Sequence, residues 1–446
     1  MNSNTNYTRN SGVEEFALDS LTPEDITTNV STTSLEIVSE SDERKRGMMC
    51  VAAGFTCNFM IFGIAFSYGV FQDFYTSEIG PLKSESASMV ALIGTLGTAL
   101  TYAVGVFNNS LTYYLSCTKI MLIGSTIMSL GLILTGFANQ YYQFLLTQGI
   151  MFGIGSSFLY LPPVVCAPAY FDKNRSIAMG IVFSGTGFGG LAMAAFSRYL
   201  IAHVGWRWCV RILGFMNLFV TGAASFLVYE PKTFNSVAHS RGLFKMNQLG
   251  SLKVWLQLLA SFLQSAGYLI PLIYMSKYGQ TLGFSLDQGA LFIGVNNAVN
   301  AIFKVIIGYA ADRLGRLNMI TVCSLLSATT IFGLWLISTR ETFISFIVLY
   351  GVFTGAIIAL LPTCLVELFG LQNYQSLSGL MYFARGIGSL CGSPIAGLFI
   401  TGGGSKSSEY RGSIIYNGAL LLASSICLIA LRTAVAFPKQ KFKWKV

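Results

Sequence analysis

The feature that most constrains this chain is a series of twelve apolar segments, divided six and six by a polar stretch near residues 230–250. Each segment is long enough to cross a bilayer, because a helix needs roughly 20 apolar residues to span the hydrocarbon core. The segments are expected at residues 48–71, 88–110, 119–138, 142–169, 176–199, 208–229, 253–276, 288–310, 317–338, 342–366, 378–400 and 413–436. The sequence therefore predicts an all-α membrane protein with 12 transmembrane helices.

Composition excludes a soluble protein. Hydrophobic residues make up 53% of the chain and charged residues only 11%, against about 25% charged in a typical soluble domain. The 46 glycines favour close packing of transmembrane helices, because small residues let helix backbones approach. The nine cysteines fall mainly inside apolar segments with no paired spacing, so we expect no disulfide framework, no metal site and no cofactor.

The placement of charge predicts topology. The formal net charge is +9. When both chain ends are placed in the cytosol, most lysines and arginines outside the segments fall on the cytosolic side. This distribution follows the positive-inside rule, so the basic residues indicate topology and contact with anionic lipid, not binding of nucleic acid.

Polar stretches divide the chain into five parts. Residues 1–46 are expected to form a disordered cytosolic tail, since they cannot bury enough apolar surface to offset chain entropy. Six-helix bundles are expected at 47–229 and 253–436, with a cytosolic linker at 230–252 and a basic tail at 437–446. We expect a multi-pass protein of the plasma membrane, with a vacuolar or other internal membrane as the alternative.

The two groups of segments repeat each other weakly at a spacing of about 200 residues. Leu161 and Pro162 in the fourth segment recur as Leu361 and Pro362 in the tenth. The fifth and eleventh segments share a second pattern, formed by Phe183, Gly185 and Gly187 and by Phe383, Gly386 and Gly388. Parallel six-helix repeats of this kind are how major facilitator transporters are built, and the chain resembles that fold: two pseudo-symmetric six-helix bundles.

The strongest local motif leaves the eighth segment and turns into the ninth. It runs through Gly308, Asp312, Arg313, Gly315 and Arg316. It resembles the short loop motif of the major facilitator superfamily, which stabilises one conformation of the bundle. Asp312 can lie near a helix N-terminus, while Arg313 and Arg316 reach a carboxylate such as Glu367. The alternative is a basic loop that only obeys the positive-inside rule.

A second stretch resembles the monocarboxylate porter family, and most closely its fungal branch. The matching residues run from Tyr170 through Arg175 to Gly180 and from Phe183 to Gly189. Further matches extend the resemblance over about residues 48–436: Ser67–Gln72, Gly205–Arg207 and Glu367–Gln372. The resemblance implies a carrier of small organic anions.

This chain also departs from that family. Animal proton-coupled members carry a lysine late in the first span, where Phe66 falls here. In the eighth span they carry an aspartate and, four residues later, an arginine; these positions are Asn300 and Lys304. Lys304 keeps the positive charge of the family's arginine, but Asn300 replaces the aspartate with an uncharged amide. The resemblance therefore does not imply lactate as the solute.

Two cations, Lys304 and Arg385, are expected at membrane depth. Charge at that depth usually lines a cavity or a pathway. No aspartate or glutamate lies in the middle of any predicted segment, so an anionic guest would supply the missing charge. The alternatives are that Lys304 extends to the headgroups, and that Arg385 caps helix carbonyls or pairs with Glu367.

Uncharged polar residues complete the predicted binding site. Asn296 and Asn300 lie four apart and share one helix face with Lys304, four residues further on. Further candidates for solute contact lie in the first half: Asn58, Tyr68, Gln148 and Tyr160. Each of these four can instead bond one helix to another.

These features predict a secondary transporter that moves a small organic solute, an anion such as a monocarboxylate or a related metabolite, by alternating access. No nucleotide-binding motif and no catalytic cluster is found, so neither a primary pump nor an enzyme is expected. A transporter-like nutrient sensor and a carrier of a neutral or vitamin-like solute remain alternatives. Protons remain a candidate coupling ion through Lys304, because a buried lysine can exchange its proton near neutral pH.

Overall fold

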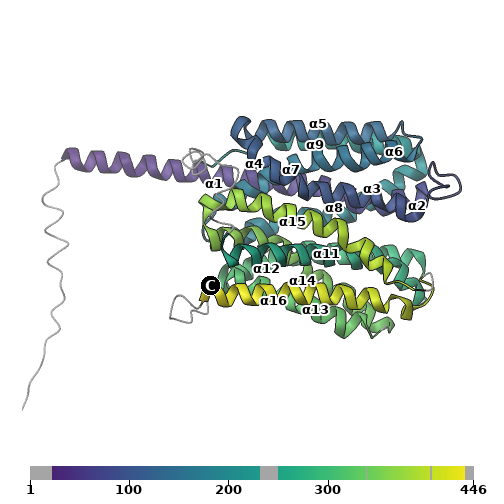
Figure 1. Cartoon of the computed structure of the whole chain (residues 1–446). Helices are drawn as coiled ribbons and strands as arrows, with labels where there is room; N and C mark the ends of the chain where they lie inside the picture. Colours follow the sequence, from purple (N-terminus) through teal and green to yellow (C-terminus); the bar gives the residue numbers. More distant parts are fainter. Residues whose placement is uncertain (1–22, 232–249, 338, 402–403, 437–446) are drawn as a thin grey trace, which may run out of the picture. The chain divides into compact units, whose positions relative to one another are not determined.

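The computed structural model describes residues 23–231, 250–337, 339–401 and 404–436 (Figure 1). The chain separates into two compact units, residues 1–46 and residues 47–446, and the fold described below is that of the second unit. The described residues form helices and short connections, with no strand among them.

The first half contains the helices of the predicted segments one to six. They are α1 (Pro23–Phe66), α2 (Tyr68–Tyr75), α3 (Ala87–Ala103), α4 (Gly105–Tyr114), α5 (Cys117–Thr135), α6 (Tyr141–Phe144), η1 (Leu145–Met151), α7 (Phe152–Cys166), η2 (Ala167–Ala169), α8 (Arg175–Val204) and α9 (Trp206–Ser225). The first and second segments are each broken once, at Ser67 and Val104. The fourth segment contains a turn of π-helix, η1, ahead of Pro162 and Pro163.

The second half repeats this arrangement with fewer breaks. Its helices are α11 (Leu252–Thr281), α12 (Leu286–Leu314), α13 (Arg316–Thr330), η4 (Ile331–Trp335), α14 (Arg340–Phe369), α15 (Leu371–Leu398), η5 (Ser407–Tyr410) and α16 (Arg411–Ala436). Pro362 lies inside α14 at the place that Pro162 occupies in α7, as the repeat in the sequence indicates.

Length and composition agree with the predicted membrane fold. Eleven helical stretches of the described chain are long and apolar enough to cross a bilayer. The remaining predicted segment, the eleventh at 378–400, lies in α15, which is 28 residues long but carries Arg385 and many serine and amide side chains. Because of these polar residues α15 is not among the eleven apolar stretches. Its length nevertheless suffices to span the hydrocarbon core.

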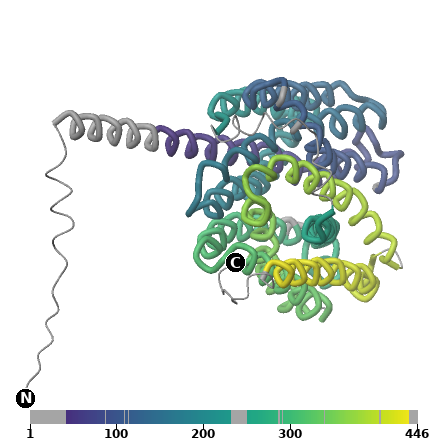
Figure 2. The backbone as a smooth tube through the Cα atoms, turned by 60° about the vertical axis from the view of Figure 1, so that its left-hand side comes forward, coloured from purple at the N-terminus to yellow at the C-terminus, as the bar shows by residue number. Residues whose placement is uncertain are grey.

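Each half packs mainly within itself. In the first half α5 lies against α7 and α9, and in the second half α13 lies against α14 and α16. Figure 2 shows the yellow C-terminal helix α16 beside the green helices of the second half. The halves meet along two seams, α8 against α12 and α15 against α3 and α4. Side chains on these five helices are therefore the ones whose contacts change when the halves move relative to each other.

Two of the predicted domain boundaries need comment. The disordered tail predicted at 1–46 is corrected for residues 23–46, because α1 begins at Pro23 and continues into the first span. No proline or glycine lies between Glu24 and Arg46, so nothing in the backbone chemistry interrupts the helix. Residues 1–22, most of the predicted linker (232–249) and the predicted C-terminal tail (437–446) lie outside the described residues.

Candidate functional site

Lys304 lies deep in the seam between the halves. Its side chain is only 1% exposed, so it does not extend to the headgroups. The ammonium group on α12 donates to the Thr186 hydroxyl at 2.6 Å and to the Phe183 carbonyl at 3.2 Å, both on α8. Both partners are neutral, so the positive charge of Lys304 is hydrogen-bonded without being neutralised.

Arg385, on α15, is completely buried. One of its terminal nitrogens donates to the side-chain oxygen of Gln264 on α11. Its guanidinium carbon lies 5.5 Å from the ring centroid of Tyr102 on α3, within cation–π range. Within the described chain its Nε and Nη2 atoms have no hydrogen-bond partner.

Within the described chain neither of these buried basic residues has an acidic partner. Glu367, a predicted alternative partner of Arg385, instead lies 3.7 Å from Arg316. The buried polar residues of the described chain include no aspartate or glutamate. The membrane centre therefore holds two basic side chains with no acidic partner among the residues that the structure describes.

A small cavity adjoins Lys304. Its lining comes from both halves: Phe62, Phe66, Tyr102, Phe183 and Thr186 from the first, and Tyr268, Lys304 and Ile358 from the second. Its volume is about 10 Å³, close to the space that one water molecule requires. The central site is therefore closed in this conformation, and admitting an organic solute requires the halves to separate.

Aromatic rings surround the two cations. Tyr160 lies 5.6 Å from both Phe62 and Tyr102 and 5.3 Å from Tyr382, measured between ring centroids. Tyr102 and Tyr382, from opposite halves, lie 6.1 Å apart with ring planes only 10° from parallel. Of the tyrosines here, sequence reasoning selected only Tyr160. Tyr102, Tyr268 and Tyr382 share with Tyr160 a feature visible in the sequence: each is a tyrosine inside a predicted apolar segment. That feature could have identified them as candidates for the site.

The polar stripe of α12 serves mainly helix packing. The Asn296 amide donates to the Ile347 carbonyl of α14 at 2.8 Å. The Asn300 side chain lies beside Gly355 of α14 and interacts with the Tyr268 hydroxyl of α11. Asn300 therefore borders the central site through Tyr268, whereas Asn296 links α12 to α14.

Three of the four candidates in the first half lie away from the central cavity. The Tyr68 hydroxyl donates to the Val90 carbonyl at 2.6 Å, and Gln148 accepts from the Tyr75 hydroxyl at 3.1 Å. Tyr68 and Gln148 line a separate cavity of about 10 Å³ within the first half. Asn58 donates to the Gly54 carbonyl of its own helix at 2.8 Å. Only Tyr160 lies among the rings of the central site.

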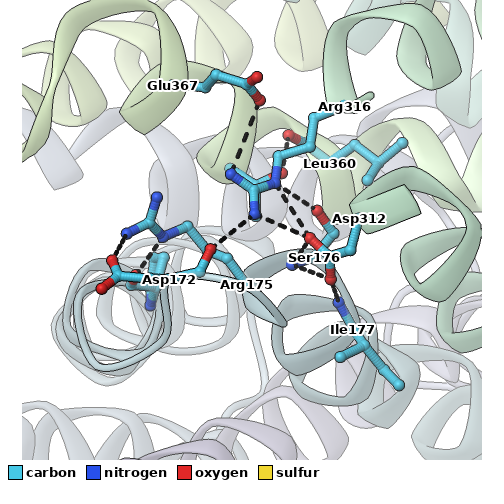
Figure 3. Close-up of polar contacts among 10 residues, drawn as sticks. Asp172, Arg175, Ser176, Ile177, Asp312, Arg316, Leu360 and Glu367 are labelled. Atoms are coloured by element: carbon cyan, nitrogen blue, oxygen red, sulfur yellow. Dashed lines mark hydrogen bonds and ion pairs between the residues drawn. The ribbon is translucent and has the colours of Figure 1, made fainter. Parts of the chain in front are cut away.

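The loop motif forms a contact between the halves at the end of the bundle predicted to be cytosolic (Figure 3). The Asp312 carboxylate accepts from the backbone N–H groups of Ser176 and Ile177, each at 3.0 Å. These groups belong to the first turn of α8, where backbone donors are unpaired and the helix dipole favours negative charge. Asp312 of the second half thus caps a helix of the first.

Arg316 extends this contact. It pairs with Asp312 at 2.9 Å and donates to the Ser176 hydroxyl at 3.0 Å and to the Asp172 carbonyl at 3.1 Å. We call Asp312, Arg316, Glu367 and the first turn of α8 the latch. Gly308 allows the close approach, since a Cβ there would lie 2.6 Å from the Ser176 carbonyl oxygen. Gly315 has a φ of 99° and turns the chain from α12 into α13.

Two basic residues near the latch have other contacts. Arg313 was predicted to reach Glu367; this is wrong, since it is exposed and lies 4.2 Å from the ring centroid of Tyr309. One position along a helix rotates a side chain by about 100°, which turns Arg313 away from the face that carries Asp312. Arg175 pairs with Asp172 at 3.0 Å and donates to the Pro168 carbonyl at 2.6 Å, so it orders the loop before α8.

Comparison with known proteins gives a consistent result. The family model described as Major Facilitator Superfamily matches residues 47–340 and 258–445. The chain is 30% identical over 403 residues to the MFS-type transporter pynF of Aspergillus niger, covering 90% of this chain and 92% of that protein. It is 28% identical to the aspyridones efflux protein apdF of Emericella nidulans, covering 82% of this chain and 74% of that protein.

A solved structure agrees at the level of the fold. The crystal structure of the human organic anion transporter MFSD10 (TETRAN) aligns with a TM-score of 0.64 at 14% identity, covering 86% of this chain and 99% of that chain. At this identity the likeness shows a shared fold and carries no information about the solute.

Proposed function

Because this chain belongs to the major facilitator superfamily, we propose that it is a secondary transporter that moves a small organic anion by alternating access to the central site. Membership of the family makes it a multi-pass membrane transporter. The charge of the solute and the mode of transport are our proposal, and they rest on the contacts of Lys304 and Arg385.

The proposal rests mainly on the burial of Arg385 and on the hydrogen bonds that its guanidinium leaves unmade. A buried ion costs several kcal/mol in real proteins unless its charge and its donors are matched. Arg385 is fully buried, has the neutral partners Gln264 and Tyr102, and leaves Nε and Nη2 without a well-formed hydrogen bond in the described chain. A carboxylate or similar anion would bind both nitrogens in the fork geometry that guanidinium groups favour. Such a guest offsets the cost that the empty site carries.

Lys304 supports the same conclusion from the opposite seam. Its two neutral partners hold the ammonium beside the cavity without cancelling its charge. A solute that contacts Lys304 touches the seam between α8 and α12. One that contacts Arg385 touches α15, which packs against α3. Binding would therefore involve both lines along which the halves move.

The latch supports alternating access. It joins the two halves at the predicted cytosolic end, so opening the site to the cytosol would have to break the Asp312 and Arg316 contacts. The small central cavity fits a conformation closed on that side. Solute binding would then need to offset the loss of the latch, which ties transport to occupancy of the site.

The direction of transport and the membrane are part of this proposal, which the names of two relatives and the predicted topology support. Two relatives are named as efflux proteins, of aspyridones and of agnestins, and we propose export from the cytosol across the plasma membrane. A vacuolar or other internal membrane is the alternative location. The narrower resemblance to monocarboxylate porters, and coupling to protons through Lys304, stay predictions.

The test is counterflow in proteoliposomes that contain only the purified protein. Vesicles loaded with an unlabelled organic acid should accumulate the same labelled acid, and Arg385→Gln should abolish the exchange. Arg411→Gln serves as the matched control, because Arg411 is exposed at the start of α16. Exchange that survives Arg385→Gln contradicts the proposal. Acid binding without exchange in the wild type favours the sensor alternative.

A further inference from the structure

The central site combines positive charge with aromatic surface. Aromatic side chains make up most of the lining next to Lys304, with Thr186 and Ile358 as the exceptions. The guanidinium of Arg385 lies over the Tyr102 ring. It also interacts electrostatically with the hydroxyls of four tyrosines: Tyr102, Tyr160, Tyr268 and Tyr382. A small aliphatic acid would satisfy the charges and leave most of this aromatic surface without a partner.

The rings of Tyr102 and Tyr382 provide two parallel faces from opposite halves. Their centroids lie 6.1 Å apart and their planes differ by 10°. A flat ring stacks on an aromatic face at about 3.5 Å, so the halves must separate before one can enter between these two rings. A flat guest at this position would contact both halves at once.

Two hydroxyl groups lie at the same place. The Tyr160 and Tyr382 hydroxyls are buried and interact with each other, and within the described chain they have no further hydrogen-bond partner. Each hydroxyl carries one donor and two acceptor lone pairs, so the pair keeps hydrogen-bonding capacity that a solute can use. Together with Arg385 they place polar groups from three side chains around one aromatic-walled space.

We propose that the solute is a planar aromatic anion, with its acidic group on Arg385 and Lys304 and its ring against Tyr102, Tyr160 and Tyr382. This inference rests on the anion transport proposed above. The Tyr160 and Tyr382 hydroxyls bond a hydroxyl or carbonyl group carried on the ring of the solute. The ring contacts distinguish aromatic from saturated acids, and the charges distinguish acids from neutral compounds.

The experiment uses the purified full-length protein in lipid nanodiscs and measures binding by calorimetry. 2-Naphthoate is compared with decalin-2-carboxylate, which has the same charge and carbon skeleton but a saturated ring. Aromatic contacts add about 0.5–1.5 kcal/mol per pair, so two or more rings predict about tenfold tighter binding of the aromatic acid. 6-Hydroxy-2-naphthoate should bind about threefold tighter still, through Tyr160 or Tyr382.

Variants assign the effect to the rings. Tyr382→Leu should reduce the preference for 2-naphthoate to about twofold or less, while Tyr142→Leu, at an exposed tyrosine of α6, should leave it unchanged. Tyr382→Phe keeps the ring and should weaken only the preference for the hydroxylated acid. This variant keeps the inference testable if Tyr382→Leu does not fold.

The outcomes separate this inference from the proposed function. Equal binding of the two acids, with both lost in Arg385→Gln, overturns the aromatic inference and leaves anion transport standing. Binding of neither acid, or binding that Arg385→Gln does not change, overturns both. A preference for 2-naphthoate that survives Tyr382→Leu and Tyr102→Leu also contradicts the inference, because the selectivity would then lie elsewhere.

Discussion

The latch and the membrane centre each have two basic residues, and the two places differ in whether acidic side chains lie next to them. At the latch Arg316 lies 2.9 Å from Asp312 and 3.7 Å from Glu367, and Arg175 lies 3.0 Å from Asp172. At the centre Lys304 and Arg385 bond only neutral groups in the described chain. At the latch each charge is paired within its own half, and Asp312 and Arg316 bond the other half through backbone and hydroxyl groups. At the centre the unpaired buried charge leaves a place for a partner from outside.

The difference also follows the surroundings of the two sites. The latch is partly open to solvent, where ion pairs contribute little each and several must act together. The centre is fully buried, where an unmatched charge is costly and its neutralisation is worth correspondingly more. Substitutions at the centre should therefore alter solute handling most strongly, and substitutions at the latch should alter the balance between conformations.

The largest expected effect is that of Arg385→Gln. Removing the guanidinium removes two charge-assisted hydrogen bonds to the solute, each worth about 1.5–3 kcal/mol, so exchange of organic acid should fall at least about 100-fold. Counterflow in proteoliposomes measures this. The protein should remain folded, since the loss relieves a buried charge; unchanged exchange would place the solute away from α15.

Lys304→Gln should have the next largest effect, a loss of about 10–30-fold in exchange, because one charge-assisted contact of about 1.5–2 kcal/mol is removed. Thr186→Val is the matched variant: it takes one partner from Lys304 and keeps the charge. Its exchange should stay within about threefold of wild type if Lys304 serves the solute. Equal losses in both variants would show that Lys304 acts only by joining α12 to α8.

Asp312→Asn tests the latch. It removes the negative charge from the first turn of α8, a contact worth about 0.5–2 kcal/mol, and weakens the hold on Arg316. Hydrogen exchange at the Ser176 and Ile177 amides should speed up about tenfold, measured by mass spectrometry in nanodiscs. Acid binding should change far less than in Arg385→Gln. Unchanged amide exchange would mean that the cap does not hold the halves together.

The smallest effect is expected from Arg313→Gln. Its guanidinium is exposed over the Tyr309 ring, and such exposed contacts contribute only about 0.5–1 kcal/mol. Transport and the exchange of the Ser176 amide should both match wild type. The neighbouring Arg316→Gln should resemble Asp312→Asn. An effect of Arg313→Gln as large as that of Arg316→Gln would contradict the division of roles at the latch.

The sequence predicted the fold because hydropathy and segment length dominate in lipid. It also placed Lys304 and Arg385 at depth, since helical rise converts residue spacing into distance. It could not find their partners. The contact of Asp312 joins residues 136 positions apart, and that of Arg385 with Gln264 spans 121; such contacts depend on how helices far apart in the sequence rotate against each other.

The errors have local causes. Arg313 and Arg316 look alike in the sequence, and only the rotation of α12 decides which one faces the latch. Asn296 shares a polar stripe with Lys304, yet an amide can bond α14 as readily as a solute. The tyrosines of the central site were passed over because tyrosine in an apolar segment is also ordinary packing. The contact between the Tyr160 and Tyr382 hydroxyls, from opposite halves, becomes visible only in three dimensions.

The central claim is that two uncompensated cations await a negatively charged solute. The most direct measurement is counterflow of organic acids paired with their own primary amides, which keep size and shape but lose the charge. The account predicts saturable exchange of acids, little exchange of the matching amides, and loss of that discrimination in Arg385→Gln. Equal exchange of acids and amides by the wild-type protein would contradict it.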